Sequence, residues 1–146
     1  MPYLDKISKL CDDKPITITR TRVESYMSKT HEEGLWILST PGDVIAMFSL
    51  VCMPGCCGVV ISTNCQVSLQ YRRRGLGTLL NEMRRQMAYE LGYSCMLCTD
   101  VIDNIPQQRI LRAWNCIANF TNRRTGNHIL LHEIQLMHID NLGFNL

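Results

Sequence analysis

The spacing of apolar and polar residues predicts mainly strands in the first half of the chain. Apolar residues at helical spacing predict a short helix over residues 4–11, which the run Asp12-Asp13-Lys14-Pro15 ends. Alternation of apolar and polar residues then predicts four strands, at residues 16–20, 35–38, 44–51 and 58–69. Turns at 41–43 and 53–57 join the last three strands as hairpins. The segment 23–33 is polar and predicts only a weak helix.

A helical period begins after Gly75. Apolar residues recur every three or four positions from Leu76 to Leu91, which indicates an amphipathic helix, and Gly92 suits the left-handed residue that ends it. The residues that fall outside this apolar stripe are Asn81, Glu82, Arg84, Arg85 and Gln86. The pattern next predicts a buried strand at 94–101, a helix at 105–117 and a closing strand at 127–136. This order favours an α/β (α+β) domain, a mixed and mostly antiparallel sheet with helices on both faces.

Composition limits the class of protein. The 146 residues are 46% hydrophobic and 19% charged, with a formal net charge of +2, as expected of one folded domain over residues 1–146. A strongly basic tail and a disordered chain are excluded. No charged residue occurs between Asp43 and Arg72, but Pro54-Gly55 and Gly58 interrupt this stretch, so we expect two buried strands and no membrane span.

The eight cysteines are interpreted as free thiols. The first residues lack a charged segment followed by a long apolar one, so we expect no export signal and a cytoplasmic chain, where thiols stay reduced. We expect Cys11, Cys65 and Cys116 in or near the core. Cys95 and Cys98 form a Cys-x-x-Cys, but in a strand they point to opposite faces, so we expect no metal site.

The segment from Val67 to Leu80 carries the most specific chemistry. A predicted strand runs through Arg72-Arg73-Arg74 and a glycine-bearing turn into a helix whose first amides have no internal partner, an arrangement that binds phosphate. The sequence contains no Gly-Lys-Ser/Thr of a P-loop. The dinucleotide-binding pattern fails as well, because its third glycine is replaced by Leu80.

Arg72, Gly75 and Gly77 match Arg-x-x-Gly-x-Gly, and here the chain resembles the GNAT superfamily of acyl-CoA-dependent N-acetyltransferases. The resemblance covers roughly residues 35–136. It implies that acetyl-CoA is the co-substrate and that strands near Val67 and Val101 splay apart to hold it. The residues that it assigns to coenzyme A are Val67, Ser68 and Leu69 along the arm, Arg72, Arg73, Arg74, Gly75, Leu76, Gly77 and Thr78 at the pyrophosphate, and Asn104 at the pantetheine.

Two catalytic side chains common in that family are absent. The tyrosine expected two turns after Asn104 is replaced by Leu111 and Arg112, and the fourth strand carries residues 62–65, Ser-Thr-Asn-Cys, where a glutamate is usual. An amine must lose its proton before it attacks a thioester, so a base is still needed. Asp100 is the candidate, and a structural pairing with Arg109 or Arg112 is the alternative.

The resemblance implies direct transfer of an acetyl group to an amine, on a small molecule or a protein. The alternative is a catalytically inactive module of the same fold that binds coenzyme A or another protein. Arg123-Arg124 beside Phe120 and Asn122 suggests nucleic acid, but the modest net charge and the lack of a known reading module argue against it. The sequence is compatible with a homodimer.

Overall fold

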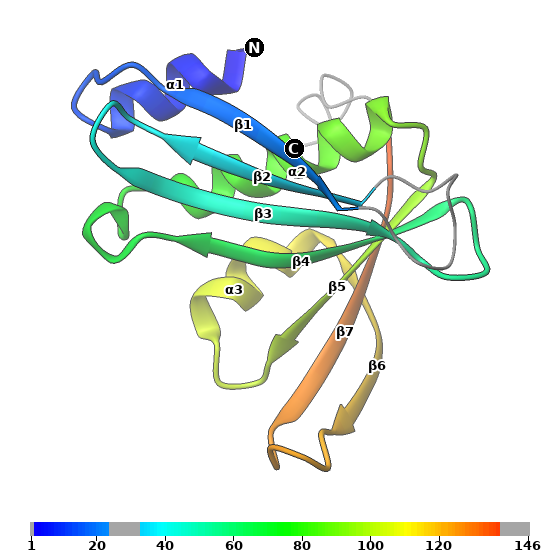
Figure 1. The fold of residues 1–146 in the computed structure, drawn as a ribbon. Coiled ribbons are helices and arrows are strands. Elements are labelled where there is room, and N and C mark those ends of the chain that lie inside the picture. The colour runs from blue at the N-terminus through cyan, green and yellow to red at the C-terminus, as the bar shows by residue number, and fades with distance from the viewer. Residues whose placement is uncertain (1, 24–32, 138–146) are drawn as a thin grey trace.

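A computed structural model describes residues 2–23 and 33–137 of the chain (Figure 1). Its sheet has seven strands in the order β1-β2-β3-β4-β5-β7-β6. β4 and β5 run parallel, and every other pair of neighbouring strands in this sheet is antiparallel. The predicted mixed, mostly antiparallel sheet is therefore confirmed.

The strands are β1 Thr17–Val23, β2 Glu33–Ser39, β3 Val44–Cys52, β4 Val59–Val67, β5 Cys95–Val101, β6 Asn115–Thr121 and β7 His128–Gln135. The α-helices are α1 Pro2–Leu10, α2 Leu76–Glu90 and α3 Ile105–Ile110, and short 3-10 turns η1 and η2 span Leu69–Tyr71 and Leu111–Ala113. The predicted hairpin turns join β2 to β3 and β3 to β4. The uncharged stretch after Asp43 thus forms two strands, and no described helix is long and apolar enough to cross a membrane.

Alternating side chains of the central strands build the core under α2. Trp36 and Phe48 stack with ring centroids 5.4 Å apart, and Leu38, Leu50 and Val60 are buried beside them. α1 and α2 contact each other, and both lie behind the sheet in Figure 1. α2 also contacts α3, β3 and β4, so it is the helix around which the site elements are arranged.

The structure corrects the predicted polar side of α2. Leu76, Leu80 and Met83 are buried as expected, but Asn81, Arg84 and Arg85 are buried as well. The apolar stripe was expected to be the only buried part of the helix. α2 is covered by α1 and α3 in addition to the sheet, so side chains that flank the stripe are also enclosed.

Two predicted elements are shorter than expected. β4 ends at Val67, and Leu69 begins η1. The predicted helix at 105–117 ends at Ile110, and Asn115–Thr121 forms β6, a strand that the prediction missed. The apolar residues Cys116 and Ile117 fit a helix or a strand, and pairing with β7 decides between the two. Most of the predicted weak helix at 23–33 lies outside the described residues.

No disulfide joins any two of the eight cysteines, all of which the structure describes. Cys11 is buried and Cys65 partly buried, as expected, but Cys116 is exposed, as is every residue of the edge strand β6. Among the described residues, no group of three or more histidine, cysteine or carboxylate side chains is placed to hold a metal ion.

Ile7 anchors α1 to the core, and this gives a test of the α1 position. Its side chain is fully buried, so replacing it with alanine leaves a cavity. We expect Ile7→Ala to lower the free energy of unfolding by about 2 to 5 kcal/mol in chemical denaturation. Lys6→Ala, at an exposed neighbouring position, is the control and should change it little. Equal effects of the two substitutions would show that α1 does not pack where the structure places it.

Candidate functional site

The site begins where β4 and β5 part. The two strands pair only from Val59 to Ile61 with Cys95 to Leu97, although each continues beyond the last pair (Figure 1). A cavity of about 370 Å³ lies in the opening. Its lining residues are Ser62, Thr63, Cys65, Gln66, Arg84, Cys98, Thr99, Asp100, Val101, Asn104 and Gln107. The predicted splayed strand pair is confirmed.

A bulge in β4 accompanies the parting. Met47 of β3 pairs with Gln66, whereas Ser49 pairs with Thr63, so β4 has one more residue than β3 in this interval. An extra residue bends a strand and leaves backbone groups outside the regular ladder. The bend therefore falls in the part of β4 that borders the cavity.

The end of β4 turns one backbone amide toward the opening. The Ser68 N–H donates to the Ile45 oxygen of β3 at 2.8 Å. Because neighbouring residues of a strand direct their backbone groups to opposite sides, the N–H and C=O of Val67 point away from β3, to the β5 side. The Arg72 Nε donates to this carbonyl at 2.9 Å. The Val67 N–H is left on the open side of β4.

The turn before α2 exposes backbone donors. Gly75 is the N-cap of α2, with φ +86°, and no side chain caps the helix. The first amides of α2, at Leu76, Gly77 and Thr78, have no partner within the helix and lie at the positive end of its dipole. This is the geometry that the sequence predicts for a phosphate site.

The fold itself also requires a glycine at both Gly75 and Gly77. The positive φ of Gly75 would strain any residue with a side chain. A Cβ at Gly77 would lie 2.8 Å from the Ile110 Cδ1, so this glycine lets α3 approach α2. A glycine substitution would therefore disturb the fold together with any ligand site.

The three arginines of the turn have different surroundings. Arg72 and Arg73 are exposed. Arg74 donates to the Leu10 and Gln70 carbonyls at 3.2 Å, forms an ion pair with Asp12 at 3.4 Å and lies over the Tyr71 ring. Arg74 thus ties the turn to the end of α1, and Arg72 and Arg73 are the better placed of the three to meet an anion.

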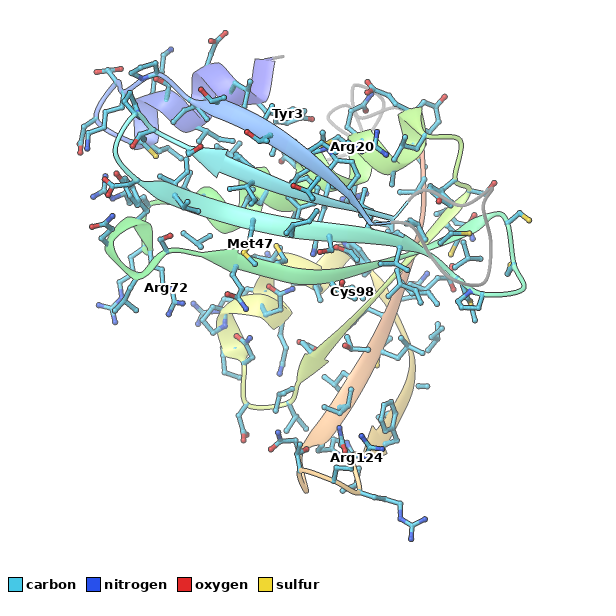
Figure 2. All side chains as sticks on the ribbon, viewed as in Figure 1. Tyr3, Arg20, Met47, Arg72, Cys98 and Arg124 are labelled. Atoms are coloured by element: carbon cyan, nitrogen blue, oxygen red, sulfur yellow. The ribbon has the colours of Figure 1, made fainter. Side chains whose placement is uncertain are left out.

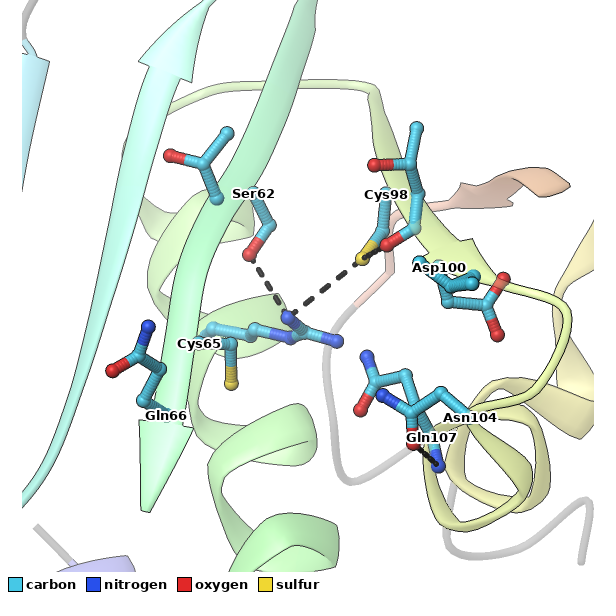
Figure 3. Close-up of a pocket in the computed structure, with 11 residues that line it drawn as sticks. Ser62, Cys65, Gln66, Cys98, Asp100, Asn104 and Gln107 are labelled. Carbon is cyan, nitrogen blue, oxygen red and sulfur yellow. Dashed lines mark hydrogen bonds between the residues drawn. The ribbon is translucent and has the colours of Figure 1, made fainter. Parts of the chain in front are cut away.

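Asn104 stands at the start of α3, on the far side of the opening. Its Oδ1 accepts a hydrogen bond from the Gln107 N–H at 3.2 Å, so it caps the helix (Figure 3). The amide Nδ2 remains as a donor at the cavity wall. Leu69, in contrast, is 78% exposed and lies outside the cavity lining.

Asp100 is paired with a histidine that sequence reasoning missed. The Asp100 Oδ1 lies 2.8 Å from the His132 Nε2, and both side chains are buried. The Asp100 Oδ2 and the His132 Nδ1 are buried without a hydrogen-bond partner. The carboxylate points away from Cys65 and Gln66 on the opposite strand (Figure 3). The contact between Asp100 and His132 follows from the register of β5 and β7. Cys98 pairs with His132, and Asp100 lies two residues further along β5, on the same face as Cys98. This register could not be predicted from the sequence.

Arg84 is the second residue that the sequence did not identify. Arg84 is 1% exposed and lines the cavity. Its Nη1 donates to the Ser62 Oγ at 3.0 Å and to the Cys98 Sγ at 4.0 Å, the two bonds that are drawn as dashed lines to the labelled Ser62 and Cys98 in Figure 3. Its Nη2 donates to the Asn81 Oδ1 at 3.0 Å, and the guanidinium lies over the Trp114 ring. A buried cation thus stands in the cavity wall, bonded to both parting strands.

Comparisons with solved structures find the same fold. A GNAT-family acetyltransferase from Elizabethkingia anophelis with acetyl-CoA bound is 14% identical, with TM-score 0.63 over 82% of this chain and 98% of that chain. The ribosomal-protein-S18-alanine N-acetyltransferase of Escherichia coli is 11% identical, with TM-score 0.62 over 82% and 94% of the two chains. A Bacillus subtilis acetyltransferase in complex with CoA is 12% identical, with TM-score 0.62 over 83% and 100%.

No family model matches the sequence, and no curated protein matches it either. At these identities the structural likeness establishes the fold. The chain has the GNAT fold, and the resemblance carried by Arg72, Gly75 and Gly77 is confirmed at that level.

The thiols give a test of the site geometry. Burial raises the pKa of the Cys98 thiol, with Arg84 acting in the opposite direction, so Cys98 holds less thiolate than an ordinary cysteine at any given pH. We expect Cys98 to react with iodoacetamide more slowly than the exposed Cys56, Cys57 and Cys116, and its rate to rise only at higher pH. Mass spectrometry of labelled peptides measures this. Labelling in denaturant should abolish the difference. Equal rates for Cys98 and Cys116 in the folded protein would contradict the structure.

Proposed function

We propose that this chain transfers an acyl group from acyl-coenzyme A to an amine. The observation that carries the proposal is the junction of two binding elements in one place. β4 parts from β5 beside the cavity, and the chain then runs directly into the uncapped N-terminus of α2. The opening between β4 and β5 suits the extended pantetheine arm of coenzyme A, and the N-terminus of α2 suits its pyrophosphate. Known structures of this fold hold acetyl-CoA or CoA, which supports the same ligand here.

Each part of coenzyme A has a matching group in the chain. The amides of Leu76, Gly77 and Thr78 would receive the pyrophosphate, and Arg72 and Arg73 would add positive charge. The Val67 N–H, on the open side of β4, and the Asn104 amide, at the cavity wall, would bind the polar groups of the pantetheine arm. The Ser68 amide is used within the sheet, and Leu69 would contact the outer part of the arm through its backbone.

The reaction that fits is direct transfer. The nitrogen of a neutral amine attacks the thioester carbonyl carbon, the carbon–sulfur bond breaks, the amine loses a proton, and the coenzyme leaves as its thiol. Two cysteines line the cavity, Cys65 and Cys98. Cys98 is a poor nucleophile because burial raises its pKa, which disfavours an acyl-cysteine intermediate. Catalysis would rest on positioning the two reactants, worth about 7 to 11 kcal/mol in well-oriented systems.

Asp100 is our proposed base. One of its oxygens is held by His132, and its second oxygen has no partner in the structure. Asp100 lines the cavity, and this second oxygen would take the proton from the acceptor's ammonium group, so that the neutral amine can then attack the thioester. Leu111 is buried and Arg112 exposed, so neither replaces the tyrosine acid common in the family.

A catalytically inactive coenzyme-binding module is the second candidate. The absence of the usual glutamate and tyrosine favours it. Incubation of the protein with acetyl-CoA and a panel of small amines, peptide N-termini and protein lysines decides between the two. Release of free coenzyme A thiol that depends on an amine would establish transfer, and binding without release would establish the inactive module.

The arginines of the turn give the most direct binding test. We expect the double variant Arg72→Gln/Arg73→Gln to bind coenzyme A about ten-fold or more weakly in calorimetry, because two charge-assisted contacts to phosphate are weakened. Arg123→Gln/Arg124→Gln is the matched control, since it removes the same charge from exposed positions. Arg72 and Arg124 lie at distant parts of the molecule (Figure 2). Equal affinities of the two double variants would show that the turn before α2 is only a helix start.

Asp100 is tested by the pH dependence of transfer. We expect Asp100→Asn to lower kcat/KM most at acid pH, where fewer amines are already neutral and a base matters more. The exposed Asp103→Asn variant, two positions past the end of β5, should follow the unaltered protein at every pH. Parallel profiles for Asp100→Asn and the unaltered protein would remove Asp100 from the role of base.

A further inference from the structure

We propose that Arg84 makes this cavity specific for an acyl group that ends in a carboxylate, as in a short dicarboxylic acyl thioester. This inference rests on the proposed function and names its acyl donor. Neither the motif nor the fold requires it, since Arg84 lies on α2 seven residues past Gly77, the last residue of the motif. It follows from the surroundings of one buried side chain.

The Arg84 guanidinium is buried and, among the described residues, forms no ion pair, although the Asp100 carboxylate lines the same cavity and is paired with His132. A guanidinium has five N–H donors, and here the partners are a hydroxyl, a thiol and an amide oxygen, from Ser62, Cys98 and Asn81. The Arg84 Nε is buried with no hydrogen-bond partner. A buried charge whose N–H donors are not all paired is unfavourable, and an anion that enters the cavity would offset this cost.

The guanidinium stands at the closed end of the cavity. Ile61 and Leu97 are the last paired residues, and Ser62 and Cys98 are the first residues beyond them. Arg84 bonds to both of these, so it sits at the apex of the opening. Val101, at the end of β5, and Asn104, at the start of α3, line the part of the cavity beyond the paired residues, where the pantetheine arm would enter. A thioester that enters from this part of the cavity therefore directs the far end of its acyl chain to Arg84.

The guanidinium is also fixed in its orientation. The Trp114 ring covers it, with 5.6 Å between the Arg84 Cζ and the ring centroid, and Asn81 binds Nη2 one turn earlier on α2. A held guanidinium with free N–H groups suits a carboxylate, which can accept two hydrogen bonds at once. The methyl group of an acetyl chain offers no such partner. A carboxylate separated from the carbonyl by a short chain would neutralise the charge.

The transfer step keeps the carboxylate unchanged. The amine nitrogen bonds to the thioester carbonyl carbon, the carbon–sulfur bond breaks, and the amine proton leaves, so coenzyme A departs as a thiol. The product is an amide that ends in a free carboxylate. An acceptor amine would thereby exchange a positive charge for a negative one.

The test compares three ligands on the unaltered protein by calorimetry: succinyl-CoA, butyryl-CoA and free coenzyme A. Succinyl and butyryl chains have the same number of carbons and differ at the terminal carboxylate. We expect succinyl-CoA to bind about ten-fold or more tightly than butyryl-CoA. If free coenzyme A binds but succinyl-CoA and butyryl-CoA bind equally well, this inference is overturned and the proposed function stands. Equal binding of the two acyl donors is also the result expected if Arg84 only polarised the thioester carbonyl. If coenzyme A does not bind, the proposed function fails first and this inference fails with it.

Variants locate the preference. Arg84→Met should abolish the preference for succinyl-CoA. It should leave the affinity for free coenzyme A within about two-fold, because Arg84 would contact the acyl group and not the coenzyme A part of the ligand. Arg85→Met removes the adjacent buried arginine of α2, which does not line the cavity, and should keep the preference. Thermal melts show whether each variant is folded, and the comparison of ligands on the unaltered protein stands without them. Retention of the preference in folded Arg84→Met would contradict the inference.

Discussion

Neighbouring strands of a sheet are held together by backbone hydrogen bonds, and between β4 and β5 this ladder stops after Ile61 and Leu97. Beyond that point each strand has one edge without a strand partner, and the backbone groups on that edge need other partners. The bulge in β4 bends the strand at the same place. The cavity and its lining by both strands follow from this interruption.

The glycines and arginines of the turn show how one segment meets structural and chemical needs together. Gly75 permits the backbone to enter α2, and Gly77 permits α3 to pack on it. Arg74 fastens the same turn to α1, and only Arg72 and Arg73 stay exposed. The glycines of this motif are therefore needed for the fold as well as for a ligand. Substitutions that remove the charge of Arg72 and Arg73 separate a binding role from a structural role better than glycine substitutions do.

Local patterns predicted what local forces determine. The hairpins around β3, the left-handed Gly92 and the start of α2 depend on neighbouring residues, and they agree with the structure. β6 and the burial of Arg84 depend on partners far along the chain, namely β7, α3 and the parted strands, and the sequence alone did not indicate them. His132 meets Asp100 through the register of β5 and β7, which no spacing within one strand reveals. The sequence thus offers Asp100 as a candidate, and its contact with His132 is visible only in the structure.

Amide hydrogen exchange with and without coenzyme A tests most directly whether the opening between β4 and β5 is a binding site. The account predicts slower exchange in three places when coenzyme A is added: at Val67, at the first amides of α2, and around Asn104 at the start of α3. The β6–β7 hairpin end near Arg124 should exchange at an unchanged rate. Protection confined to other segments, or no change in these three with coenzyme A in excess, would contradict it.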